Sequence, residues 1–183
     1  MRVLAGALKG QHLVTPKGRT TRPTADQVRI ACLDTLMPYL EGPFLDLFAG
    51  AGGVGIEALS RGAPSAVFVE RDRLAAIALD ENVARLGLGE RARVLRQDVT
   101  RALALLEREE RTFGVVFLDP PYDSPDGAAA LTRVAQGHCL LPGAVVVAQH
   151  ATKAPLPAAP GRLEHWKDRR FGETTLTFFR RGA

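Results

Sequence analysis

Short apolar runs alternate along the middle of the chain with longer segments in which apolar residues recur every three or four positions. The short runs are typical of strands buried on both faces of a sheet, and the longer segments of amphipathic helices. Strands are therefore predicted over residues 43–50, 65–71, 92–98, 113–121 and 143–150. Helices are predicted between them, over residues 53–63, 72–88, 99–109 and 126–140. Such alternation predicts a mostly parallel sheet with helices on both faces.

The two ends of the chain depart from this alternation. Residues 2–15 hold two short apolar runs around a glycine, which predict a small β-hairpin, and a basic loop and a helix over residues 24–40 follow. Residues 161–181 hold two strand-like runs joined at a Phe-Gly pair, which predict an antiparallel hairpin at the sheet edge. The pattern thus predicts a Rossmann-like α/β fold, with residues 1–40 as an extension and residues 41–183 as the main domain.

Composition narrows the class of protein without naming a function. The chain has 183 residues, 46% of them hydrophobic, which is enough for one domain with a substantial core. No apolar run approaches the roughly 18 residues that cross a membrane, and the first residues lack the apolar stretch of a secretory signal. Cys32 and Cys139 stand in no metal-binding pattern and fit a reducing compartment. We therefore expect a cytoplasmic, monomeric protein without a metal site.

Positive charge is concentrated at the N-terminus. Residues 1–30 hold six basic residues and one acidic residue, a net charge of +5, whereas the whole chain carries +4. These charges are interleaved with Gly, Thr and Pro, which favours a polyanion-binding arm over a solvated helix face. A plain basic surface is the alternative. The candidate contacts to nucleic acid are Arg2, Lys9, His12, Lys17, Arg19, Arg22 and Arg29.

The first two predicted strand ends carry residues suited to a nucleotide-like ligand. Ligands of open α/β sheets bind outside the carboxyl ends of the strands. Asp46 precedes the glycine pattern Gly50-x-Gly52-x-x-Gly55, and Glu70 follows Gly50 by twenty positions, where an acid commonly accepts from ribose hydroxyls. This spacing suits either a dehydrogenase or a methyl donor that contains adenosine. A tight turn and a surface acid at a helix start are the structural alternatives.

Two further strand ends complete the pattern. Asp98 could accept a hydrogen bond from an adenine amine, and it could equally cap the next helix. The fourth end reads Asp119-Pro120-Pro121-Tyr122. Prolines end a strand because they cannot donate backbone hydrogen bonds, but a plain turn needs neither the acid nor the aromatic ring.

Several segments carry a resemblance to a known family. In chain order, those that resemble the fold of methyltransferases dependent on S-adenosylmethionine are "DLFAGAGGVGIEALSRGA", "VERD", "RQD" and "FLDPPY". The last is similar to the (N/D/S)-P-P-(Y/F/W) motif of enzymes that methylate a conjugated nitrogen. The segments that closely resemble the RsmD family, which methylates the N2 amine of a guanine in small-subunit ribosomal RNA, are "RVLAGALKGQHL", "RPTADQVR" and "RRFGETTL".

The resemblance implies a cofactor, a substrate and a set of site residues. The cofactor would be S-adenosylmethionine, with S-adenosylhomocysteine as product, and the substrate 16S ribosomal RNA in an assembled or partly assembled small subunit. The catalytic residues would be Asp119, Pro120, Pro121 and Tyr122. The residues expected at the cofactor are Asp46, Phe48, Ala49, Gly50, Gly52, Glu70, Arg71, Asp98, Val99, Asp119 and, from the family segment, Thr24 beside Asp26.

The DPPY residues suit the implied chemistry. A guanine N2 amine is a poor nucleophile, and hydrogen bonds from its N–H groups to Asp119 and to the Pro120 carbonyl would improve its geometry for attack. Tyr122 offers a ring on which the base can stack, once the base is unpaired or flipped out. The chain departs from the family at Ile30, where an acid is usual, and at Asp34, where Asn is common.

Three other functions remain open on the sequence. An adenine-N6 or cytosine-N4 DNA methyltransferase would share the DPPY motif, but 183 residues leave no room for a target-recognition domain. An NAD-dependent dehydrogenase would share the glycine pattern but needs a substrate domain. A non-enzymatic RNA-binding module would keep the basic arm and has no need for Asp119 beside Tyr122.

Overall fold

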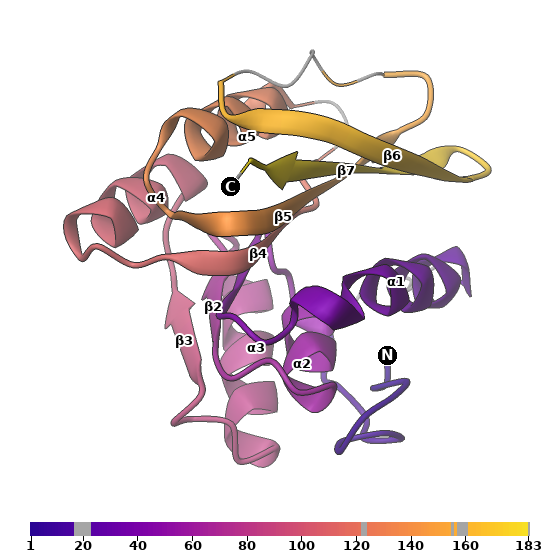
Figure 1. Cartoon of the computed structure of the whole chain (residues 1–183). Helices are drawn as coiled ribbons and strands as arrows, with labels where there is room; N and C mark the ends of the chain where they lie inside the picture. The colour runs from indigo at the N-terminus through magenta and orange to yellow at the C-terminus, as the bar shows by residue number, and fades with distance from the viewer. Residues whose placement is uncertain (17–22, 122–123, 155, 157–160, 183) are drawn as a thin grey trace.

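The computed structural model describes residues 1–16, 23–121, 124–154, 156 and 161–182. These residues form one seven-stranded sheet in the order β3-β2-β1-β4-β5-β7-β6. The parallel strands are β1 (Phe44–Leu47), β2 (Ala66–Val69), β3 (Ala92–Leu95), β4 (Phe113–Leu118) and β5 (Leu140–Ala151). The antiparallel edge consists of β6 (Leu163–Phe171) and β7 (Thr174–Arg181), with β7 paired to β5 (Figure 1).

Helices cover both faces of the sheet (Figure 1). One face packs against α1 (Pro23–Leu36), α2 (Gly53–Ser60) and α3 (Arg73–Arg85), and a short 3-10 helix, η1 (Met37–Tyr39), follows α1. The other face packs against α4 (Val99–Arg108) and α5 (Asp126–Gln136). Large side chains that alternate along the strands, such as Phe44 and Leu45 of β1, enter the two cores in turn.

The predicted Rossmann-like α/β fold with an antiparallel edge hairpin is confirmed. One helix is shorter than predicted, because residues 138–140 do not continue α5. Gly137 takes an extended conformation after the last turn of α5, and the carbonyl of Cys139 accepts a hydrogen bond from the N–H of Phe113. Leu140 then pairs with Phe113, so β5 begins three residues before the predicted strand.

The N-terminal hairpin is reduced to a single antiparallel bridge between Arg2 and His12. The chain between them makes turns instead of strands because it packs closely on α2. A β-carbon on Gly6 would lie 2.0 Å from the carbonyl oxygen of Ser60, and Gly6 has a φ of +81°, which favours glycine. Residues 1–40 and the main domain share one hydrophobic core, and the division of the chain at residue 40 stays a prediction.

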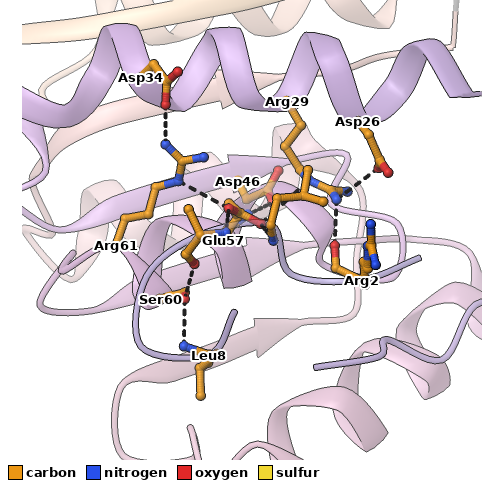
Figure 2. A network of polar contacts seen from close by, with 12 residues as sticks. Arg2, Leu8, Asp26, Arg29, Asp34, Asp46, Glu57, Ser60 and Arg61 are labelled. Atoms are coloured by element: carbon orange, nitrogen blue, oxygen red, sulfur yellow. Dashed lines mark hydrogen bonds and ion pairs between the residues drawn. The ribbon is translucent and has the colours of Figure 1, made fainter. Parts of the chain in front are cut away.

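A buried carboxylate joins this N-terminal segment to α2. Glu57 is fully buried, and it accepts hydrogen bonds from the backbone N–H groups of Leu4 and Ala5, both at 2.8 Å. The Ser60 hydroxyl accepts from the N–H of Leu8, as Figure 2 shows. These bonds fix the first residues of the chain beside the helix that follows the glycine loop. None of the helices built from described residues has the length and apolar character needed to cross a membrane.

A cavity at the carboxyl edge of the sheet

A cavity of about 910 Å³ opens where the parallel strands end. The carboxyl ends of β1, β2, β3 and β4 lie side by side in register, because neighbouring parallel strands end at the same edge. The predicted site residues that line the cavity are Asp46, Phe48, Ala49, Gly50, Glu70, Arg71, Asp98, Val99, Asp119, Pro120 and Pro121. The topology thus brings together residues that span more than seventy positions of the sequence.

The glycine loop leaves room for a ligand at one position and for packing at another. Gly50 has a φ of +58°, and a β-carbon there would meet nothing within 4 Å. Its N–H donates to Oε2 of Glu70 at 2.7 Å, which ties the loop to the end of β2. Gly52 lies outside the cavity wall: a β-carbon there would lie 2.4 Å from Leu79, so this glycine lets α3 pack against the loop.

Asp46 connects the end of β1 to the start of α2. Its side chain is 1% exposed and accepts a hydrogen bond from the N–H of Gly55 at 2.8 Å. Burial raises the pKa of Asp46 to about 8, since the low-dielectric interior disfavours its charged form. The Gly55 bond opposes this shift in pKa, and the nearby carboxylates of Asp119 and Glu70 add to it.

Asp98 both caps a helix and lines the cavity. Its side chain accepts from the N–H of Arg101 at 3.0 Å, as an N-cap of α4, so the two roles predicted for it are compatible. The preceding residue, Gln97, also lines the cavity, and its amide Nε2 is buried without a hydrogen-bond partner among the described residues. A buried donor of this kind calls for an acceptor, and a polar ligand in the cavity would supply one.

Asp119 and Pro120 form the cavity wall after β4. Burial raises the pKa of Asp119 to about 7, although the residue as a whole is only half-buried. The Pro120 ring packs on α5, where a β-carbon on Gly127 would lie 2.5 Å from the proline Cγ, so the loop is held close to the helix. Tyr122 lies outside the described residues, and its predicted stacking role stays a prediction.

The predicted RNA contacts separate into distinct groups. Arg2, Lys9 and His12 are exposed on the N-terminal segment, whereas the remaining loop residues lie outside the described part of the chain, namely Lys17, Arg19 and Arg22. Thr24 lies in α1, and its side chain is also outside the described part.

Arg29 corrects the prediction of an RNA contact. Its side chain is 5% exposed and lines the cavity instead of the outer surface. The guanidinium Nη2 donates to the Arg2 carbonyl at 2.7 Å and to Asp26 at 3.0 Å (Figure 2). Burial lowers the pKa of Arg29, and the charges of Asp26 and Glu57 oppose that change in pKa.

Several lining residues were missed by sequence reasoning: Met1, Thr15, Pro16, Cys32, Gln97, Asp126 and Gln149. Gln97 had a usable signal, because it immediately precedes a predicted strand-end acid. Residues of the N-terminal segment had none, since only the fold of that segment over α2 brings them to the cavity.

Comparisons with known proteins agree with this architecture. Residues 1–180 match the family described as "Conserved hypothetical protein 95". Ribosomal RNA small subunit methyltransferase D of Haemophilus influenzae is 34% identical to this chain over 158 residues, which cover 85% of this chain and 81% of that protein. The chain belongs to the RsmD family. Another relative, YlbH of Bacillus subtilis, is 38% identical over 182 residues, or 99% of each chain.

Solved structures show the same fold beyond the RsmD family. The structure of the yhhF protein of Escherichia coli matches with a TM-score of 0.87 at 29% identity, and covers 100% of this chain and 98% of that one. SMU.776, whose structure is a complex with SAH, matches with a TM-score of 0.71 at 11% identity, over 87% of this chain and 50% of that one. Its low identity makes SMU.776 a comparison of fold alone. The class I methyltransferase fold predicted from the sequence is confirmed.

Proposed function

We propose that this chain transfers a methyl group from S-adenosylmethionine to the exocyclic N2 amine of a guanine in small-subunit ribosomal RNA. The observation that carries the proposal is the gathering of Asp46, Glu70, Asp98 and Asp119 on one cavity wall, in an RsmD-family chain. Curated relatives bear the name ribosomal RNA small subunit methyltransferase D, which supports ribosomal RNA as the substrate. The choice of guanine N2 rests on the motif resemblance.

The cavity suits an adenosine-containing cofactor with positive charge. Its volume of about 910 Å³ is in the range of small-molecule sites. We assign the ribose hydroxyls to Glu70 and the adenine edge to Asp98 and the unpartnered amide of Gln97. When bound, S-adenosylmethionine supplies the electrophilic methyl group, and its cationic groups match the acidic wall.

The loop after β4 is assigned the chemistry of the amine. The carboxylate of Asp119 and the carbonyl of Pro120 accept hydrogen bonds from the two N–H groups, which orients the nitrogen lone pair toward the methyl carbon. As the N–C bond forms, the carbon–sulfur bond breaks with its electron pair on sulfur, and the amine then loses one proton. Positioning of this kind supplies much of the rate in a bimolecular transfer. Tyr122 is assigned to stack on the flipped base.

RNA is assigned to the surface beside this cavity. Arg2, Lys9 and His12 are exposed on the segment that packs on α2. Phosphate contacts from such residues would fix the orientation of the RNA, and the base itself would be read in the cavity. The proposed partner is an assembled or partly assembled small subunit.

Methyl transfer to defined substrates tests the proposal. Small subunits and free 16S RNA, both lacking the modification, are incubated with the protein and cofactor labelled at the methyl group, and the RNA is digested to nucleosides. We expect label in N2-methylguanosine, with more incorporation into the subunit. Label in N6-methyladenosine would reject the assignment of guanine. Tighter binding of NAD than of S-adenosylmethionine would reject methyl transfer itself.

A further inference from the structure

Arg29 is a buried cation whose hydrogen-bonding capacity is only partly used by the protein. Nη2 is occupied by the Arg2 carbonyl and by Asp26, while Nε lies 3.8 Å from Oε2 of Glu57 and makes no hydrogen bond among the described residues. The structure also describes no hydrogen-bond partner for Nη1. Figure 2 shows how the guanidinium is held on one side by the N-terminal segment and α1. A side chain restrained in this way presents its remaining N–H groups in a fixed direction.

The free side of this guanidinium adjoins the first turn of α2. Nη1 lies 3.2 Å from the position that a β-carbon of Gly53 would take, and both Arg29 and Gly53 line the cavity. Gly53 is the first residue of α2, and the N-cap, Gly52, provides no side-chain hydrogen bond. Within the described part of the chain, the N–H groups of Gly53 and Val54 have no acceptor. An uncapped helix start of this kind favours an anion.

The remainder of the cavity wall selects which ligand group can be that anion. Of the described residues that line the cavity, only Arg29 and Arg71 are basic. Arg71 is 58% exposed and pairs with Asp126 at 3.2 Å, so its charge is directed to another partner. A ligand of this cavity therefore meets carboxylates along most of its length and one buried cation beside α2.

We propose that Arg29 and the first N–H groups of α2 form a carboxylate subsite, which binds the amino-acid carboxylate of S-adenosylmethionine. This inference rests on the proposed cofactor. S-adenosylmethionine carries a sulfonium, an ammonium and one carboxylate, and the carboxylate is its only anionic group. The guanidinium donates through Nη1, and Gly53 and Val54 donate through the backbone. Glycine at position 53 is required for this approach, because a side chain there would occupy the space between α2 and Arg29.

Two ligands that differ only in the carboxylate test the subsite. S-adenosylmethionine and its decarboxylated form share the adenosine, the sulfonium and the amine, so the ratio of their dissociation constants isolates the carboxylate. A hydrogen-bonded charge pair predicts that the native protein binds the carboxylate form about 10- to 100-fold more tightly. In Arg29→Gln, we expect this ratio to fall to within about threefold of unity. Isothermal titration calorimetry of the RNA-free protein measures all four constants.

A matched variant separates carboxylate binding from loss of structure. Arg61 also pairs with Glu57, at 3.1 Å, but does not line the cavity. Arg61→Gln should leave the ligand ratio unchanged even where it lowers stability. Equal ratios in native protein and Arg29→Gln, or equal binding of the two ligands by native protein, would overturn the subsite. If neither ligand binds, the proposed cofactor fails instead. Should Arg29→Gln not fold, Arg29→Lys and the native ratio decide the matter.

Discussion

Two sets of charged residues that look equally promising in the sequence are used very differently in the fold. The acids at the strand ends, including Asp46 and Glu70, line one cavity. The basic residues near the N-terminus do not act as one group: Arg2 and Lys9 are exposed, whereas Arg29 is buried against that same cavity. The difference shows that strand order determines where an acid at a strand end will lie. A basic residue on a helix or in a loop is placed by tertiary contacts, which the sequence pattern does not reveal.

The largest effect that would sharpen this comparison is expected at Asp119. Asp119→Ala removes the proposed acceptor of the amine, and methyl transfer should fall by about 10²-fold or more. Binding of S-adenosylmethionine should change much less, since Glu70 and Asp98 are assigned to the adenosine. Single-turnover transfer and calorimetric binding measure the two effects separately. Turnover equal to that of the native protein would remove Asp119 from the reaction.

The next largest effect is expected at Glu57, which links the N-terminal segment to the main domain. Glu57→Ala leaves Arg29 and Arg61 without their buried partner and two backbone N–H groups without an acceptor. We expect a loss of about 3–5 kcal/mol in the free energy of unfolding, measured by urea denaturation.

Asp34→Ala is the matched control for Glu57. Asp34 also pairs with Arg61 but is 59% exposed, so its removal should cost at most about 1 kcal/mol. Similar losses in the two variants would mean that Glu57 does not hold the N-terminal segment in place.

A moderate effect is expected from pH, because the pKa of Asp46 is raised to about 8. Asp46 is therefore mostly protonated at pH 6, and a cationic ligand that favours its carboxylate must displace the proton. The affinity for S-adenosylmethionine should rise from pH 6 to pH 8, by at most about tenfold per pH unit for one proton. The same raised pKa makes the free energy of unfolding fall as pH increases toward 8. Asp46→Asn should flatten both profiles, and a pH-independent affinity in the native protein would contradict the assignment.

The sequence predicted the parts of the site that follow from strand order. Once Glu70 and Asp98 are placed at the ends of parallel strands, their approach is a property of the sheet. Arg29 could not be placed in this way, because its partner Glu57 is remote in sequence and on another helix. The same holds for Met1, which lines the cavity only because the chain folds over α2. Gln97 is intermediate: its position at a strand end was visible, but its buried, unpartnered amide was not.

The smallest effect, and the most direct test of the difference between the two kinds of basic residue, concerns the salt dependence of RNA binding. Each phosphate contact adds about one to the magnitude of the slope of log affinity against log salt concentration. Arg2→Ala and Lys9→Ala should each weaken binding to small-subunit RNA a few-fold and reduce that slope by about one. Arg29→Gln should leave the slope unchanged, because a guanidinium enclosed by Asp26 and Glu57 releases no counterion when RNA binds. Filter binding over a series of salt concentrations measures all three slopes. A reduced slope in Arg29→Gln would return Arg29 to the RNA interface, whereas unchanged slopes in the other two variants would remove the exposed N-terminal residues from it.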